Sequence, residues 1–265
     1  RKGNYRYKLK IVVIKSMGLR VHDDFKAKSN AWVYRTENSA SIEVDGEGLR
    51  MCVGPSEALY YSDAEISDGS FDSLRWRGGS VEFRIKFQFD HFGSAGFGFW
   101  NYSMVTDLSM PIWFIYLNSR GKYPLRGFFA QAGRNFCPLI LREPGLNSSI
   151  LSLISRLFPS WVGVKVLSSR PALKSFDAST HHLYKIEWKG DLAKFYVDGL
   201  EVCRVLDEFL NGKRARLDVW IDNSVFMPLR NDPGKVYRHA TQELRERHCL
   251  YLKSIDAEGL VSGSD

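Results

Sequence analysis

Residues 182–202 read HLYKIEWKGDLAKFYVDGLEV, and this stretch decides the fold. Apolar and polar residues alternate along 182–188 and again along 192–197, as they do in β-strands with one buried face. Lys189-Gly190-Asp191 separates these two segments, and Asp198-Gly199, a dipeptide typical of tight hairpins, turns the chain into a third. The stretch therefore predicts a three-strand antiparallel meander.

Similar strand patterns recur along the rest of the chain. VEFRIKFQF (81–89) places five apolar residues on one face and four polar residues on the other. GFGFWN (96–101) and PIWFIYLN (111–118) are apolar on both faces, which is typical of central strands in a two-layer fold. Many short strands with little helix predict one all-β domain over residues 1–265, built as a sandwich or jelly roll.

Three segments depart from this pattern. Residues 1–20 are predicted to form an N-terminal extension or an edge strand. Residues 134–180 are predicted to be an insertion with a short amphipathic helix, because NSSILSLISRLF (147–158) has an Asn cap followed by apolar residues at helical spacing. VYRHATQELRERH (236–248) is polar and is predicted to include a helical turn.

Composition narrows the classes of partner. The 265 residues carry a net charge of +7, but Lys and Arg are scattered, and the densest run, KRAR (213–216), is short and directly precedes a predicted strand. We therefore expect no nucleic-acid partner. No apolar run approaches the roughly 18 residues that span a bilayer, so no membrane contact is predicted either. Oligomeric state stays open.

The four cysteines, at 52, 137, 203 and 249, form no C-x-x-C pair, which argues against a zinc cage or a redox motif. We predict buried free thiols, with two disulfides as the alternative.

Several motifs, taken in order, resemble the concanavalin A-like lectin and glucanase superfamily, and within it the family-16 glycoside hydrolases of the laminarinase and lichenase type. They are VHDDF (21–25), VDGEGLRM (44–51), GGSVEFRIKF (78–87), GFGFWN (96–101), the meander, and RLDVWIDN (216–223). The resemblance covers about residues 20–258 outside the insertion. It implies a jelly roll of two curved antiparallel sheets with a concave sugar-binding cleft.

The resemblance also implies an E-x-D-x-E motif on a cleft strand, with one Glu as nucleophile and the other as general acid and base. By order in the chain the motif belongs near residues 108–120, which contain no Asp or Glu. Glu43, Asp45 and Glu47 have the right spacing, but they lie on an earlier strand that has no catalytic role in the family. We therefore predict that these three acids are not catalytic.

The best candidate for a cleft strand is 215–223. If Leu217, Val219 and Ile221 face the core, then Asp218, Trp220 and Asp222 face outward together, a row that suits a sugar because indoles stack on pyranose rings and carboxylates accept hydroxyl hydrogen bonds. The alternative is that the tryptophans fill the sandwich core and the acids bond to nearby loops.

Strand parity also places Trp100 on the same face as Gly96 and Gly98, and the glycines are expected to leave room for a ligand above them. Asn101 and Asn223 follow the two tryptophan strands and are added as ligand-binding candidates. Glu82 and Arg84, on the polar face of their strand, are predicted to contact the ligand from the cleft wall.

A second group of candidates lies near the C-terminus. Arg238, His239, Gln242 and Glu243 form the densest cluster of potentially catalytic residue types, and a helical turn would place His239 and Glu243 on one face. The catalytic candidates are thus Asp218, Asp222, His239 and Glu243, with Arg238 and Gln242 as ligand contacts. A surface turn rich in paired charges is the alternative.

The leading hypothesis is a carbohydrate-binding protein with an oligosaccharide or polysaccharide as its partner. A glycoside hydrolase or polysaccharide lyase with other catalytic residues is the second hypothesis, and a structural or assembly module is the third. No cofactor is assigned. The resemblance brings a structural calcium ion into consideration, with Asp256 as its candidate ligand, and it favours an extracellular or cell-surface location.

Overall fold

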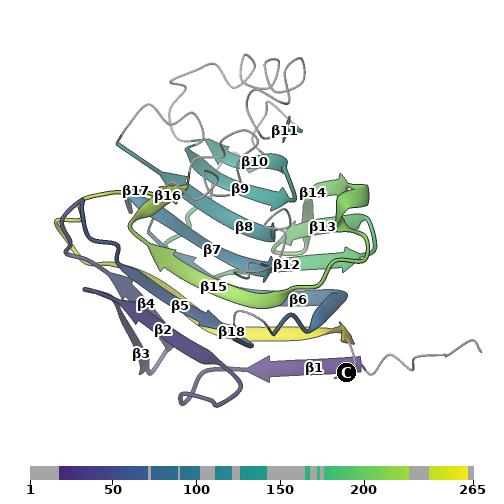
Figure 1. The fold of residues 1–265 in the computed structure, drawn as a ribbon, viewed down its shortest axis with the longest axis horizontal. Helices are drawn as coiled ribbons and strands as arrows, with labels where there is room; N and C mark the ends of the chain where they lie inside the picture. Colours follow the sequence, from purple (N-terminus) through teal and green to yellow (C-terminus); the bar gives the residue numbers. More distant parts are fainter. Residues whose placement is uncertain are drawn as a thin grey trace, which may run out of the picture.

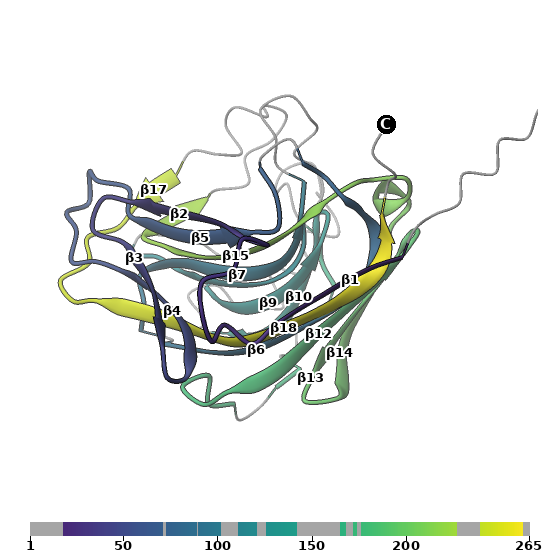
Figure 2. The same ribbon diagram turned by 90° about the horizontal axis from the view of Figure 1, so that it is seen from below.

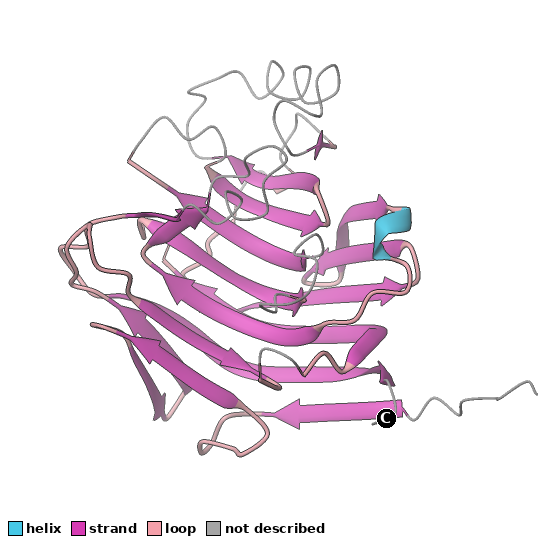
Figure 3. Cartoon of the chain, in the orientation of Figure 1, coloured by secondary structure: helices cyan, strands magenta, loops and turns pink. Residues whose placement is uncertain are grey.

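The computed structural model describes residues 18–70, 73–88, 90–101, 111–120, 126–141, 165–167, 172–173, 176–226 and 239–261. In these residues nearly every element is a β-strand, and one short 3-10 turn, η1 (Glu208–Leu210), follows the last strand of the meander (Figure 3). None of the described segments forms a helix long and apolar enough to cross a membrane. The predicted all-β sandwich is confirmed.

Two sheets of eight strands pack face to face (Figure 1). Sheet 1 has the order β14 (Leu200–Leu206), β13 (Leu192–Val197), β12 (His182–Lys189), β6 (Trp76–Phe87), β18 (His248–Val261), β4 (Gly48–Val53) and β3 (Ser41–Asp45), with β1 (Gly18–Asp23) paired to β18. Sheet 2 has the order β11 (Lys165–Val166), β10 (Asn135–Leu141), β9 (Gly127–Ala132), β8 (Pro111–Asn118), β7 (Gly93–Trp100), β15 (Arg216–Asp222), β5 (Asp63–Ser67) and β2 (Val33–Glu37). A small hairpin joins β16 (Ser224–Phe226) and β17 (His239–Thr241).

The meander has the predicted strands and turns. Antiparallel pairing sets Tyr184 opposite Val197 in β12 and β13, and β13 continues into β14 with one β-bulge. Asp198 and Gly199 both have positive φ angles, 50° and 81°, as the tight Asp-Gly turn requires. Local sequence therefore determines this part of sheet 1.

The core lies between the two sheets and contains the apolar face of each strand. In β6, for example, Val81, Phe83, Ile85 and Phe87 are buried, while the polar residues between them face outward. Figure 2 shows both sheets bowed in the same sense, with sheet 1 on the outside of the curve. The side of sheet 2 that points away from the core is the outer face of sheet 2.

The segments predicted to depart from the sheets are partly strands. Residues 18–20 belong to β1, which pairs with the C-terminal half of β18. The edge-strand alternative fits these residues. The expected insertion over 134–180 begins with β10, an integral strand of sheet 2. The helix expected over 147–158 lies outside the described residues.

The predicted helical turn around His239 and Glu243 is wrong. Residues 239–241 form β17, in which His239 pairs with Phe226, and no helix is present among residues 242–248. The extended backbone pairs with β16 instead of coiling, and β17 ends at Thr241, so His239 and Glu243 do not lie one helical turn apart.

The prediction of free thiols is also wrong, because all four cysteines form disulfides. Cys52 of β4 lies directly opposite Cys249 of β18 in the same sheet. Cys137 of β10 and Cys203 of β14 come from opposite sheets, and their Cα atoms are 6.1 Å apart. Pairing across 197 and 66 residues of sequence depends on the strand order, which the cysteine spacing does not reveal.

Replacing Cys137 and Cys203 together by Ala is expected to lower the free energy of unfolding by about 2–5 kcal/mol, because the bridge closes a long loop and joins the two sheets. Urea unfolding of the oxidised proteins measures the change. The Cys52→Ala, Cys249→Ala pair is the matched comparison: its bridge lies within sheet 1 but closes a longer loop of 197 residues, so a loss of similar size is expected. Free-thiol titration of the unfolded, unreduced wild-type protein that finds four thiols would contradict the assignment.

Candidate functional site

The outer face of sheet 2 holds the row predicted for strand 215–223. Leu217, Val219 and Ile221 belong to the main core, as expected, so the alternate residues of β15 point to the other side of the sheet. That side contains Trp220 and is itself buried, since Asp218 is 0% exposed and Trp220 is 6% exposed. Sheet 2 at β15 is therefore buried on both faces.

A second apolar cluster covers part of this outer face. Its buried members come from β8, β9, β10, β15 and β16, and they are Trp113, Ile115, Leu117, Phe129, Phe136, Trp220 and Val225. Trp100, at the end of β7, packs against them and is only partly buried. The ring centroids of Trp113 and Trp220 lie 4.7 Å apart, and the centroid of Trp100 lies 5.4 Å and 5.8 Å from them. Three indoles thus form one platform with a single partly exposed ring.

The glycines of β7 do not leave room for a ligand, contrary to the prediction. A Cβ atom added to Gly96 would overlap the six-membered ring of the Trp220 indole, and one added to Gly98 would overlap the backbone at Ile112 and Trp113. Trp220 therefore occupies the space above Gly96. The glycines allow close packing within the protein.

Asp222 lies at the far end of β15, where the residue is 5% exposed and its carboxyl group accepts several hydrogen bonds. Oδ1 accepts from the Ser94 hydroxyl (2.8 Å), the Ser94 amide (3.2 Å) and the Ser224 amide (3.0 Å), and Oδ2 accepts from the Tyr61 hydroxyl (3.2 Å). Burial raises the pKa of Asp222 to about 7, although these donors partly offset the rise. The Ser94 hydroxyl also accepts a hydrogen bond from the Trp220 indole (3.0 Å).

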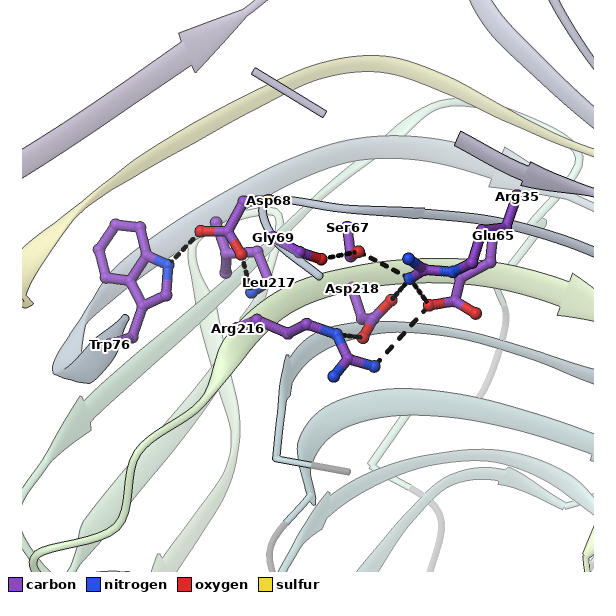
Figure 4. A network of polar contacts seen from close by, with 9 residues as sticks. All are labelled: Arg35, Glu65, Ser67, Asp68, Gly69, Trp76, Arg216, Leu217 and Asp218. Atoms are coloured by element: carbon purple, nitrogen blue, oxygen red, sulfur yellow. Dashed lines mark hydrogen bonds and ion pairs between the residues drawn. The ribbon is translucent and has the colours of Figure 1, made fainter. Parts of the chain in front are cut away.

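Asp218 belongs to a buried ionic network that Figure 4 shows. The Arg216 guanidinium, which is fully buried, contacts the Asp218 carboxyl at 2.7 Å and Glu65 at 3.8 Å. Arg35 of β2 pairs with the same Glu65 and donates to the Ser67 hydroxyl (2.7 Å). These contacts hold the acids of β5 and β15 between two arginines.

The pKa values of the two acids in this network shift in opposite directions. Burial, followed by the charge of Glu65, raises the pKa of Asp218 well above its usual value. Burial also opposes ionisation of Glu65, but hydrogen bonds with Asp218 and Arg35 and the arginine charges lower the pKa of Glu65 overall. The charges of Arg35 and Arg216 favour the ionised form of both acids, while burial opposes it.

Sequence reasoning missed the partners of this row. Asp63 and Glu65 stand directly opposite Asp222 and Trp220 in the register of β5 with β15, and Arg35 stands opposite Glu65 in β2. The alternation in DAEIS (63–67) marks a strand with acids on one face. Its pairing with a strand about 150 residues later could not be read from that alternation.

Asn223, a predicted ligand contact, is fully buried and used within the protein. Its amide nitrogen donates to Ser56, Tyr60 and the Gln242 carbonyl, and its Oδ1 accepts from the Ser62 amide. Its hydrogen-bonding groups therefore tie the loop before β5 to the segment after β17.

Of the other C-terminal candidates, Gln242 and Glu243 both contact Arg120. The Gln242 side chain accepts from the Arg120 amide (3.0 Å), and Glu243, with a side chain 44% exposed, pairs with Arg120 at 3.5 Å and Arg245 at 3.2 Å. His239 is placed only by its backbone in β17, and Arg238 lies outside the described residues. Asn101, at the end of β7, is buried.

Glu82 and Arg84 lie on the other sheet. β6 belongs to sheet 1, where Glu82 faces outward with Lys185 at 3.6 Å, so neither residue can line a site with Trp220. Asp256 is on the same sheet and accepts from the His22 ring (2.8 Å). Among the residues that the structure describes, no group of three His, Cys, Asp or Glu side chains could hold a metal ion.

The acids at 43 and 47 are likewise on sheet 1. Glu43 pairs with Arg50 and lies 3.7 Å from Arg247, and Glu47 pairs with Lys86 at 2.7 Å. Both carboxylates are exposed surface partners of basic residues.

Comparison with known proteins identifies the fold. No family model and no curated protein matches the sequence. Among solved structures, the catalytic domain of an endo-1,3-beta-glucanase (laminarinase) from Thermotoga petrophila matches with a TM-score of 0.51 and 14% identity, over 92% of this chain and 99% of that one. Bacillus licheniformis beta-glucanase matches with a TM-score of 0.50 and 12% identity, over 90% and 97%.

A third similar structure is a 1,3-alpha-1,4-beta-D-galactose-4-sulfate-3,6-anhydro-D-galactose 4 galactohydrolase, with a TM-score of 0.50 and 14% identity over 97% of this chain and all of that one. The predicted resemblance to laminarinase and lichenase type glucanases is confirmed at the level of the fold. The chain is a glucanase-like jelly roll of two curved, mostly antiparallel sheets.

Replacing Asp222 by Asn is expected to flatten the pH dependence of stability. Because the folded pKa of about 7 lies above the usual 3.8, Asp222 contributes stability that is fully present below about pH 4 and is lost as pH rises through 7. At roughly 1.4 kcal/mol per pH unit, this loss is about 4 kcal/mol in wild type. Urea unfolding from pH 4 to 8 measures it.

The quantity to compare is the difference between wild type and Asp222→Asn at each pH. Burial lowers the pKa of His91 to about 4, so His91 contributes in the opposite sense, with stability lost as pH falls from 6.5, and it does so in both proteins. Parallel pH profiles for the two proteins would contradict the assignment.

Gly96→Ala is expected to destabilise the protein by about 1–3 kcal/mol, because the added methyl group displaces the Trp220 indole from a close-packed site. Near-ultraviolet circular dichroism should change as the indole moves, and urea unfolding gives the free energy. Gly46→Ala is the control, since a Cβ there meets no atom within 4 Å. Equal behaviour of the two variants would contradict the packing of Trp220 over Gly96.

Proposed function

We propose that the protein is a carbohydrate-binding protein of the glucanase-like jelly-roll type, which holds an oligosaccharide or polysaccharide against the outer face of sheet 2. The indole platform carries this proposal. Trp100 is only partly buried, and its ring packs against two buried indoles. A sugar ring packs its apolar face on such an indole, while its hydroxyl groups reach polar neighbours.

The composition of β8 supports binding rather than glucanase catalysis. The family resemblance implies an E-x-D-x-E motif on this strand, with its acids pointing into the cleft. The outward-facing residues of β8 are instead Trp113, Ile115 and Leu117, which belong to the platform cluster. These side chains can neither donate a proton to a glycosidic oxygen nor attack an anomeric carbon.

The acids elsewhere on the face also support binding. Asp218 is fully buried against Arg216, and both oxygens of Asp222 accept hydrogen bonds from the protein. Hydrolysis through Asp222 remains the second candidate, because a carboxyl group with a pKa of about 7 holds a proton at neutral pH as a general acid does. Release of reducing ends from a polysaccharide panel, lost in Asp222→Asn, is the result that hydrolysis requires.

The names of the similar structures suggest the first ligands to test. Two are glucanases, one of them acting on 1,3-beta-glucan, and the third acts on a sulfated galactan. A 1,3-beta-glucan oligosaccharide and a sulfated galactan oligosaccharide therefore represent a neutral and an acidic glycan.

Trp100→Ala is expected to lower the affinity for the bound oligosaccharide by about tenfold or more, because stacking on an aromatic ring contributes about 0.5–1.5 kcal/mol beyond the area that it buries. Isothermal titration calorimetry against both oligosaccharides measures the affinity. Phe209→Ala is the matched control, since Phe209 is an exposed aromatic residue on η1, in the connection from sheet 1 to sheet 2. Equal affinities of the two variants, or no binding by wild type, would refute the proposal.

A further inference from the structure

The Trp220 indole is the part of the platform that polar contacts fix in place. An indole nitrogen can only donate, so the Ser94 hydroxyl must be the acceptor in the 3.0 Å contact with Trp220. The hydroxyl proton then points elsewhere, and the Asp222 carboxyl at 2.8 Å is the acceptor that the structure provides. The direction of this chain of hydrogen bonds is therefore determined: Trp220 donates to Ser94, which donates to Asp222.

We propose that Ser94 is a positioning residue, which relays the state of the Asp222 carboxyl to the Trp220 indole and through it to the sugar-binding platform. This inference rests on the proposed function only in its last step, from the platform to the sugar. The relay from Asp222 to the indole can be tested without any glycan.

The surroundings of Asp222 act on its protonation in two opposite ways. Two hydroxyl groups, from Ser94 and Tyr61, and two backbone amides all donate to its oxygens, which favours the carboxylate. Burial of the whole group favours the neutral acid and raises its pKa to about 7. The carboxyl thus changes state near neutral pH, where a small change in conditions alters its hydrogen bonds.

The site of protonation follows from the same contacts. Oδ1 accepts three hydrogen bonds, and Oδ2 accepts one, from the Tyr61 hydroxyl. A proton is therefore placed on Oδ2, where Tyr61 can turn to accept it. Oδ1 then becomes the weaker acceptor of a neutral acid, and the hydrogen bond from Ser94 weakens without breaking.

The Trp220 indole passes the weakening of the Ser94 hydrogen bond on to the other two indoles of the platform. It fills the gap above Gly96 and touches both other indoles, with ring centroids 4.7 Å from Trp113 and 5.8 Å from Trp100. Close packing transmits a displacement of one ring to its neighbours. The partly exposed Trp100 ring is the neighbour that a sugar would contact.

Other titratable groups face this carboxyl and must be separated from it. Tyr61, in the loop before β5, and Asp63, on β5, interact with Asp222 directly, and His91, before β7, contacts its backbone. Glu65, Arg35 and Glu37 act on Asp63 and through it on this group of residues. His91 contacts the Asp222 carbonyl at 2.6 Å and stays neutral near pH 7, because burial lowers its pKa to about 4. Burial also raises the pKa of Asp63, so Asp63→Asn is the necessary control.

The test is a pH titration of intrinsic tryptophan fluorescence from pH 5 to 9 in the absence of glycan. Wild type and Asp63→Asn are expected to show a transition with its midpoint near 7, and Trp220→Phe and Asp222→Asn are expected to lose it. Ser94→Ala is expected to lose it as well, because the carboxyl still titrates but no longer contacts the hydroxyl that holds the indole. A transition unchanged in Ser94→Ala, or lost in Asp63→Asn, would overturn the relay.

Tyr61→Phe keeps the proposal testable if Ser94→Ala does not fold. Loss of the Tyr61 hydroxyl removes a donor to the carboxylate, so the midpoint should move to higher pH. A midpoint that stays in place or falls would overturn the assignment of the transition to Asp222.

The affinity for the 1,3-beta-glucan oligosaccharide completes the test. Between pH 6 and 8 it should change by about two- to tenfold in wild type, the effect of one hydrogen bond, and stay constant in Ser94→Ala. A fluorescence transition without binding of either oligosaccharide would refute the proposed function and leave the relay intact. Binding with the same affinity at both pH values would refute the coupling and leave the function intact.

Discussion

Burial of both faces of sheet 2 at β15 is the constraint on which the rest of the structure depends. The inward residues of β15 join the core between the sheets, and its outward residues are buried as well. A charge removed from water on both sides of a sheet must find its partners within the protein. Arg216 meets this requirement through Asp218 and Glu65, and Asp222 meets it through hydroxyl and amide donors. The aromatic cluster fills the remaining area of the same face.

The elements that the sequence could predict depend on neighbours close along the chain. Alternation of apolar and polar residues over 182–202 specifies two strands and their turns, since strand parity is a local property. Parity also places Leu217, Val219 and Ile221 on one face, which in the structure is the core face. An outward row was therefore predictable, but its burial was not, because parity says nothing about what covers a face.

The features that the sequence could not predict depend on strand order. Asp63 meets Asp222, and Cys52 meets Cys249, across 159 and 197 residues of sequence, and each pair is fixed by a register that the whole sandwich sets. The gap above Gly96 shows the same limit, because an absent side chain predicts space but not its occupant. In a fold with so many non-local strand pairs, these contacts follow from topology rather than from spacing.

Access, more than spacing, determines what a carboxyl group on this scaffold can do. Glu43 and Glu47 have the spacing of a glycosidase pair, but they lie on sheet 1 and are neutralised by basic neighbours in solvent. Asp218 and Asp222 lie on the sheet that carries the aromatic platform, yet burial and internal donors occupy them. Trp100, on the same face, is only partly buried. The proposed binding of a sugar ring depends on this arrangement, in which the nearby acids make their contacts within the protein.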